Sequence, residues 1–151
     1  LAPQDFGGGY FLIGTRTNQA GVDGLHVSKL RSPLQFDPNN DVQLDQPISL
    51  RTGTQSIQAI AAAASLASPQ GYLLLANEIR VNGASNISLS KIDQVGNLLW
   101  YVSLGSEEKN DTAATVMELA DGRIIVLGTV VIGDQTKMAL FKLNSTGRLI
   151  K

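Results

Sequence analysis

The chain has 151 residues, of which 43% are hydrophobic and 17% charged, and its formal net charge is −1. This composition is typical of a folded domain. The interspersed charges argue against electrostatic binding to nucleic acid or to an anionic membrane. Cysteine is absent, which excludes disulfides, thiolate catalysis and cysteine metal sites, and no apolar stretch approaches the roughly 20 residues of a membrane-spanning helix.

The first glycine-rich stretch is "DFGGGY" (5–10). We predict a hairpin turn here, because neither the Lys-Ser/Thr pair of a phosphate-binding loop nor a helix follows it. The next apolar segments contain His26, the only histidine. Since no Ser or Cys nucleophile motif accompanies it, we expect His26 to be a packed or surface residue of a strand.

The stretch between Lys29 and Gly71 begins with "RSPLQFDPNNDVQLDQP", which is rich in Pro and Asn and predicts an expanded loop over residues 31–48. Oxygen-bearing side chains gather within 36–45, and loop oxygens of this kind can hold Ca²⁺. The loop lacks the Gly and the terminal Glu of an EF-hand, so we assign no metal to it. Its candidate ligands are Asp37, Asn39, Asp41 and Asp45.

The segment "TQSIQAIAAAASLASPQGY" contains four consecutive alanines, which by intrinsic propensity favour a helix. The repeat described below instead aligns Ala61–Ala64 with Thr112–Thr115, in the first strand of a unit. We therefore predict a strand, with a short helix near 55–67 as the alternative.

Two short apolar runs, "YLLLANEI" and "RIIVLGTV", predict buried strands, and "NISLSKI" alternates so that Ile87, Leu89 and the stem of Lys91 share one face. "DQVGN" and "NSTGR" predict tight turns with Gly96 and Gly147 in the left-handed conformation. "LADGR" (119–123) predicts another hairpin. After the first of these turns, "NLLWYVSL" predicts an outer strand carrying Trp100, the only tryptophan.

A repeat connects these elements. Three segments align without gaps, beginning at Gly9, Gly71 and Gly122, and each reaches a Lys after the same spacing. The recurring lysines are Lys29, Lys91 and Lys142. We expect them to be structural, with stems packed between units and ammonium groups at carbonyl or carboxylate oxygens.

A unit of about 50 residues with four hairpin-connected strands is typical of a β-propeller blade. The pattern resembles bacterial secreted and cell-surface propeller repeats, which read approximately D-G-G-Y followed by hydrophobic residues and then K-x-D-x-x-G-N-x-x-W. It is also distantly similar to the repeats of quinoprotein dehydrogenases. Those carry Thr-Gly in the turn, whereas Val95 precedes Gly96 here, which argues against quinone binding.

We therefore predict an all-β, propeller-like array of four-stranded antiparallel blades forming an incomplete ring of about 2.5–3 blades. The expected units are 1–53, 54–105 and 106–151, with the innermost strand of the first and the outer strand of the last truncated. Exposed blade ends would allow a homo-oligomer, or the chain is cut from a larger propeller.

The resemblance implies a secreted or cell-envelope bacterial protein, and we predict that the chain is its non-catalytic binding or scaffold module, with a protein or glycan ligand, no nucleic acid and no membrane span. We assign no catalytic, cofactor-binding or metal-binding residue and no cofactor. The alternative is part of a propeller enzyme, quinoprotein-like or glycan-cleaving, whose catalytic residues lie outside this chain.

Overall fold

Antiparallel strands form the regular structure of the computed structural model, and the described residues contain no helix. The predicted all-β class is thus confirmed. The structure describes residues 2–3, 10–17, 19, 21, 23–31, 35–36, 54–94, 96–106 and 108–151. Within these ranges there is no helix of the length and hydrophobicity needed to cross a membrane.

The strands pair into three sheets, and in each sheet the strands are neighbours in chain order. The first sheet contains β1 (Ala2–Pro3), β2 (Tyr10–Thr17), β3 (Asp23–Arg31) and β4 (Gln35–Phe36). The second contains β5 (Thr54–Ser65), β6 (Gly71–Arg80), β7 (Ser85–Asp93) and β8 (Leu98–Leu104). The third contains β9 (Thr112–Glu118), β10 (Ile124–Ile132) and β11 (Gln135–Leu143).

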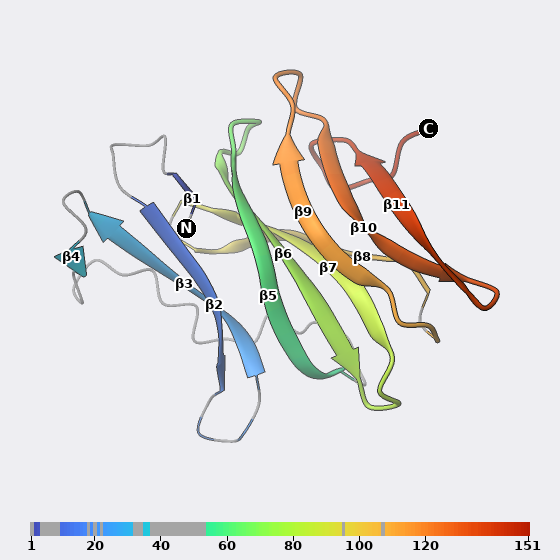
Figure 1. The fold of residues 1–151 in the computed structure, drawn as a ribbon. Coiled ribbons are helices and arrows are strands. Elements are labelled where there is room, and N and C mark those ends of the chain that lie inside the picture. Colours follow the sequence, from blue (N-terminus) through green and yellow to red (C-terminus); the bar gives the residue numbers. More distant parts are fainter. Residues whose placement is uncertain are drawn as a thin grey trace.

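The three sheets follow one another across the molecule in chain order (Figure 1). Strand β5 contacts β2 and β3 of the first sheet on one side and β9 of the third sheet on the other. The first strand of the second and third sheets therefore packs against the sheet before it.

The alanine-rich segment is strand, as the repeat predicted, since β5 spans Thr54–Ser65. It pairs along its length with β6, and a register shift between Ala59 and Ala61 marks a β-bulge. Helix propensity is overridden because small side chains suit a strand enclosed by neighbouring sheets on both sides.

The predicted turns "DQVGN" and "NSTGR" are also confirmed. The amide of Gly96 donates to the Asp93 carbonyl at 3.2 Å, and Gly147 donates to the Asn144 carbonyl at 3.0 Å. Both glycines have positive φ, at 95° and 79°. In both turns the side chain of the first Asp or Asn accepts a backbone N–H group, as the Asp93 carboxylate does from Asn97. This residue therefore stabilises each turn, as expected.

One feature of the predicted repeat is wrong. The ungapped alignment equates Gly71 with Gly122, but Lys91 pairs with Leu73 whereas Lys142 pairs with Ile125, so the second strand is offset by one residue in the third sheet. The two glycines also differ physically. Gly71 begins β6, where a Cβ would clash with the Ile92 carbonyl, while Gly122 supplies the positive φ of the β9–β10 turn.

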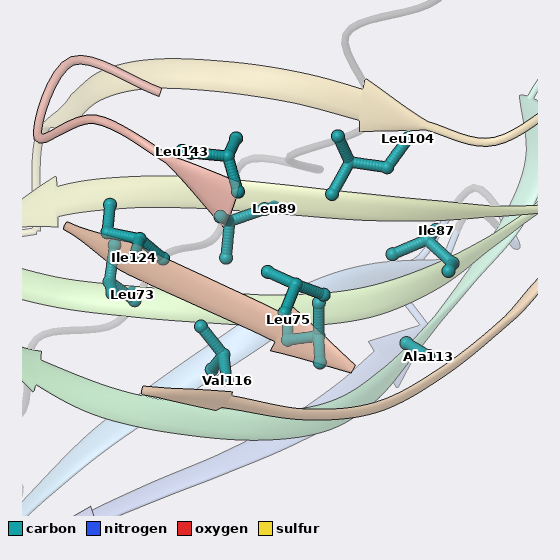
Figure 2. Packing of buried hydrophobic residues seen from close by; sticks show 10 residues of the cluster. Leu73, Leu75, Ile87, Leu89, Leu104, Ala113, Val116, Ile124 and Leu143 are labelled. Carbon is teal, nitrogen blue, oxygen red and sulfur yellow. The ribbon is translucent and has the colours of Figure 1, made fainter. Parts of the chain in front are cut away.

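Two layers of apolar side chains hold the sheets together. Strand β6 is buried on both faces, as its continuous apolar run requires. Its residues Tyr72, Leu74 and Ala76 belong to a cluster shared with the first sheet, while Leu73 and Leu75 belong to a cluster shared with the third. Figure 2 shows the second of these clusters, with side chains from β6, β7 and β8 facing those of β9, β10 and β11.

Candidate functional site

The residues singled out from the sequence do not converge in the described part of the chain. His26 is half-buried in β3, opposite Gly14 of β2. The acid-rich stretch 37–45 and the glycines of 7–9 lie outside the described residues, as does the side chain of Lys29. Among the residues described, no group of three or more His, Asp or Glu is arranged to hold a metal ion.

The role predicted for the recurring lysines is confirmed at Lys91. Its side chain is buried, and Nζ donates to the Ala67 carbonyl oxygen at 2.8 Å. Burial lowers the pKa of the Lys91 ammonium group from its ordinary value of 10.5, and attraction to the Glu118 carboxylate partly opposes this change. The lysine thus packs between sheets with its charge directed at oxygen atoms.

Glu118 connects the third sheet to the second. Its carboxylate accepts hydrogen bonds from the Ser65 hydroxyl at 2.5 Å and from the amides of Leu66 and Ala67 at 2.8 and 2.9 Å. These donors form the start of the β5–β6 turn. One carboxylate at the end of β9 therefore fixes the turn of the preceding sheet.

Beside Glu118 lies an open pocket with a volume of about 500 Å³. It is formed where the β5–β6 turn and the β9–β10 turn meet, and it combines alanine and leucine side chains with two carboxylates. The pocket is lined by Ala64, Leu66, Ala67, Glu118, Leu119, Ala120, Asp121 and Gly122. Asp121 is fixed by an exposed ion pair with Arg123, whose side chain lowers the pKa of the Asp121 carboxyl through hydrogen bonding.

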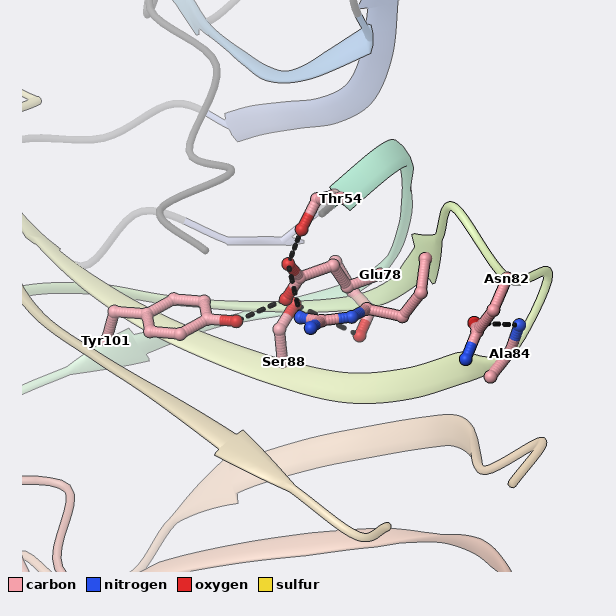
Figure 3. Close-up of polar contacts among 8 residues, drawn as sticks. Thr54, Glu78, Asn82, Ala84, Ser88 and Tyr101 are labelled. Atoms are coloured by element: carbon pink, nitrogen blue, oxygen red, sulfur yellow. Dashed lines mark hydrogen bonds and ion pairs between the residues drawn. The ribbon is translucent and has the colours of Figure 1, made fainter. Parts of the chain in front are cut away.

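A second polar group surrounds Glu78, whose side chain is fully buried near the other end of the second sheet (Figure 3). Its carboxylate accepts hydrogen bonds from the Thr54 hydroxyl and the Tyr101 phenol, and Arg80 lies 4.0 Å away. With both oxygens engaged, this carboxylate is placed to stabilise the sheet across β5, β6 and β8.

A third polar group joins the second and third sheets near that same end. Asp111 is buried, and its carboxylate accepts the amides of Ser106 at 2.5 Å and Val131 at 2.9 Å. Its backbone amide donates to the Ser85 carbonyl at 2.7 Å. The loop before β9 is therefore held to both neighbouring sheets.

The sequence reading missed these polar contacts. Glu78 and Asn77 interrupt the apolar run "YLLLANEI", and a polar pair inside an otherwise buried strand is the signal that could have found them. Glu118 carries no visible signal because its partners are more than fifty residues away in sequence.

No protein-family model matches the chain, and the comparisons with curated proteins and with solved structures likewise give no match.

Proposed function

We propose that the three sheets are successive β-propeller blades and that the chain is a non-catalytic binding module of a secreted or cell-envelope bacterial protein. The observation that carries the blade assignment is a hydrogen bond that recurs between sheets. Ala59 of β5 donates its amide to Thr15 Oγ1 at 3.0 Å, and Ala113 of β9 donates its amide to Asn77 Oδ1 at 2.8 Å.

Both donors stand immediately before a register shift in the first strand of their sheet. A bulge disrupts the ladder locally, and at both bulges the amide of the residue just before it bonds to the neighbouring sheet. Both acceptors lie on the second strand of the preceding sheet, at the same position of the repeat. We call these two contacts the junction hydrogen bonds; their recurrence supports one packing geometry used twice.

Three buried or partly buried carboxylates of the described residues favour a structural role over catalysis. Glu78, Asp111 and Glu118 each accept at least two hydrogen bonds from within the fold. A general base needs a free lone pair directed at substrate, whereas these oxygens are directed at the protein's own donors.

We place the ligand at the open pocket beside Glu118 and Asp121. Apolar walls together with carboxylate and backbone oxygens suit a glycan, which offers hydroxyl donors on its edges and apolar C–H faces. The recurring turns at this end of the sheets would repeat such a surface along the array.

Binding of the 151-residue chain to a printed array of oligosaccharides tests this proposal. Ala120 lines the pocket at an exposed position, so Ala120→Arg should block the site and abolish the signal. Gln135→Arg, exposed in the β10–β11 hairpin, is the matched control and should bind like wild type. Absence of any glycan signal, or equal binding by both variants, would refute a glycan site in this pocket.

A further inference from the structure

The third sheet has one covered face and one open face. Ile124, Val126 and Leu143 point toward the second sheet and are buried in the cluster shared with it. Side chains alternate along a strand, so their neighbours point away from the second sheet. We call that side the outer face; it carries Ile125, Leu127, Thr129, Met138, Leu140 and Lys142.

The exposed residues of the outer face occupy positions that are buried in the other two sheets. Met138 is 85% exposed, whereas the equivalent Ile87 of β7 is 0% exposed and Leu25 of β3 is 1% exposed. Leu140 is 63% exposed, and its equivalents Leu89 and Val27 are both fully buried. The outer face thus has the apolar pattern of the two faces that receive a following sheet.

The polar positions repeat as well. We align the second strands of the sheets at the residues that pair with the recurring lysines, which in β10 is Ile125. In this alignment Thr129 corresponds to Asn77 of β6 and Thr15 of β2, which accept the two junction hydrogen bonds. Lys142 corresponds to Lys91, which is buried at the junction of the second and third sheets. The outer face therefore carries an oxygen acceptor and a lysine where a covered face has them.

Each covered junction buries a large side chain in the same layer as a small residue of the following sheet. The Cδ1 atom of Ile87 lies 2.8 Å from the position that a Cβ on Gly128 would occupy. At the earlier junction, Leu25 and Ala76 belong to one buried cluster. The first sheet has Gly14 at the position of Ala76 and Gly128, and a Cβ there would meet no atom of the described residues within 4 Å.

We propose that the outer face binds the first sheet of a second copy of this chain, with Met138 of one copy packed over Gly14 of the other. The large side chain and the open glycine repeat the pair formed by Ile87 and Gly128. The contact is head-to-tail, so two copies close into a ring if the rotation allows. This inference depends on the packing of the sheets and is independent of the ligand proposed for the pocket.

Disulfide cross-linking tests the contact directly, because the natural chain has no cysteine. Met138→Cys and Gly14→Cys are introduced into separate copies of the 151-residue chain, which are mixed under mild oxidation. We expect a disulfide-linked dimer that contains one copy of each variant. The matched control replaces Met138→Cys with Val81→Cys, which is 73% exposed in the β6–β7 turn and should not cross-link with Gly14→Cys.

Three outcomes would overturn the proposal: no cross-linked product in the mixture, equal cross-linking with the Val81→Cys control, or efficient cross-linking of Met138→Cys with itself, which indicates that outer faces pair with each other. Sedimentation gives a second measurement without oxidation. Met138→Arg should weaken self-association at least about tenfold, as expected when an apolar anchor is lost. Val81→Arg should leave it unchanged, and a monomeric wild-type chain at micromolar concentration would contradict the contact.

Discussion

The indole ring of Trp100 packs on Gly147, which links the outer strand of the second sheet to the last turn of the third. A Cβ on Gly147 would lie 2.8 Å from Cε3 of the ring and 3.0 Å from Cδ2 and Cζ3. The ring is half-buried and also packs against the cluster between the two sheets. The only tryptophan of the chain therefore packs between the second and third sheets.

Gly147→Ala should lower the free energy of unfolding by about 2–5 kcal/mol, which combines the cost of a positive φ with steric overlap against Trp100. The control is Gly83→Ala, because Gly83 has a similar φ of +81° but, in the part of the chain that the structure describes, no atom lies within 4 Å of its would-be Cβ. That variant should lose only about 1–2 kcal/mol in urea denaturation. Equal losses would contradict the ring contact.

Trp100→Ala should destabilise the chain by about 3 kcal/mol, at the low end of the range for aromatic truncation because the ring is only half-buried. Trp100→Phe should keep more than half of this contribution, since it retains an aromatic ring over Gly147. Urea denaturation followed by circular dichroism measures both variants. A loss below about 1 kcal/mol for Trp100→Ala would show that the contact contributes little.

Glu118→Ala should cost about 2–4 kcal/mol, because two backbone amides and a hydroxyl lose their acceptor and Lys91 loses the nearby opposite charge. Glu108→Ala serves as the control, since Glu108 is exposed in the β8–β9 loop. It should change the unfolding free energy by less than about 0.5 kcal/mol. Similar effects of the two substitutions would argue against Glu118 as the connection between the sheets.

Lys91 should make stability depend on alkaline pH. Its pKa is lowered in the folded protein, so the unfolded chain binds more protons between that lowered value and 10.5. The contribution of Lys91 to stability should therefore rise as pH increases through this window. The unfolding free energy of wild type relative to Lys91→Met, measured across the alkaline range, should increase with pH. A constant or decreasing difference would contradict the assigned burial of the charge.

Asn77→Ala removes the acceptor of the second junction hydrogen bond and leaves the Ala113 amide unpaired at a buried position. We expect a loss of about 1–3 kcal/mol and faster hydrogen exchange at the Ala113 amide. Asn82→Ala is the control, because Asn82 accepts a hydrogen bond only within the exposed β6–β7 turn. Unchanged exchange at Ala113 in Asn77→Ala would show that the junction hydrogen bond is absent in solution.

Much of the fold could be predicted because its signals are local. Apolar runs bounded by turn residues located the strands, and Gly96 and Gly147 have the positive φ that their turns require. The strand at Ala61–Ala64 was recovered only because the repeat outweighed helix propensity, a preference that the two flanking sheets override.

The errors and omissions come from contacts between distant segments. Gly71 and Gly122 match by residue type, yet one permits close approach of two strands and the other forms a turn. The strand register that separates them is set by pairing across the hairpin and is invisible in the spacing. Glu118 was missed as a junction residue for the same reason, since only folding brings its donors near.

Nuclear Overhauser contacts between the sheets test the central claim, that the sheets stack in chain order through one repeated geometry. In a sample with labelled methyl groups, we expect contacts between the Ile87 methyl and the Gly128 backbone, and between the Leu25 and Ala76 methyl groups. Observing both would establish the two equivalent junctions. Contacts of Ile87 with the first sheet in place of the third, or of Leu25 with the third sheet, would contradict the stack and indicate a sandwich or a barrel.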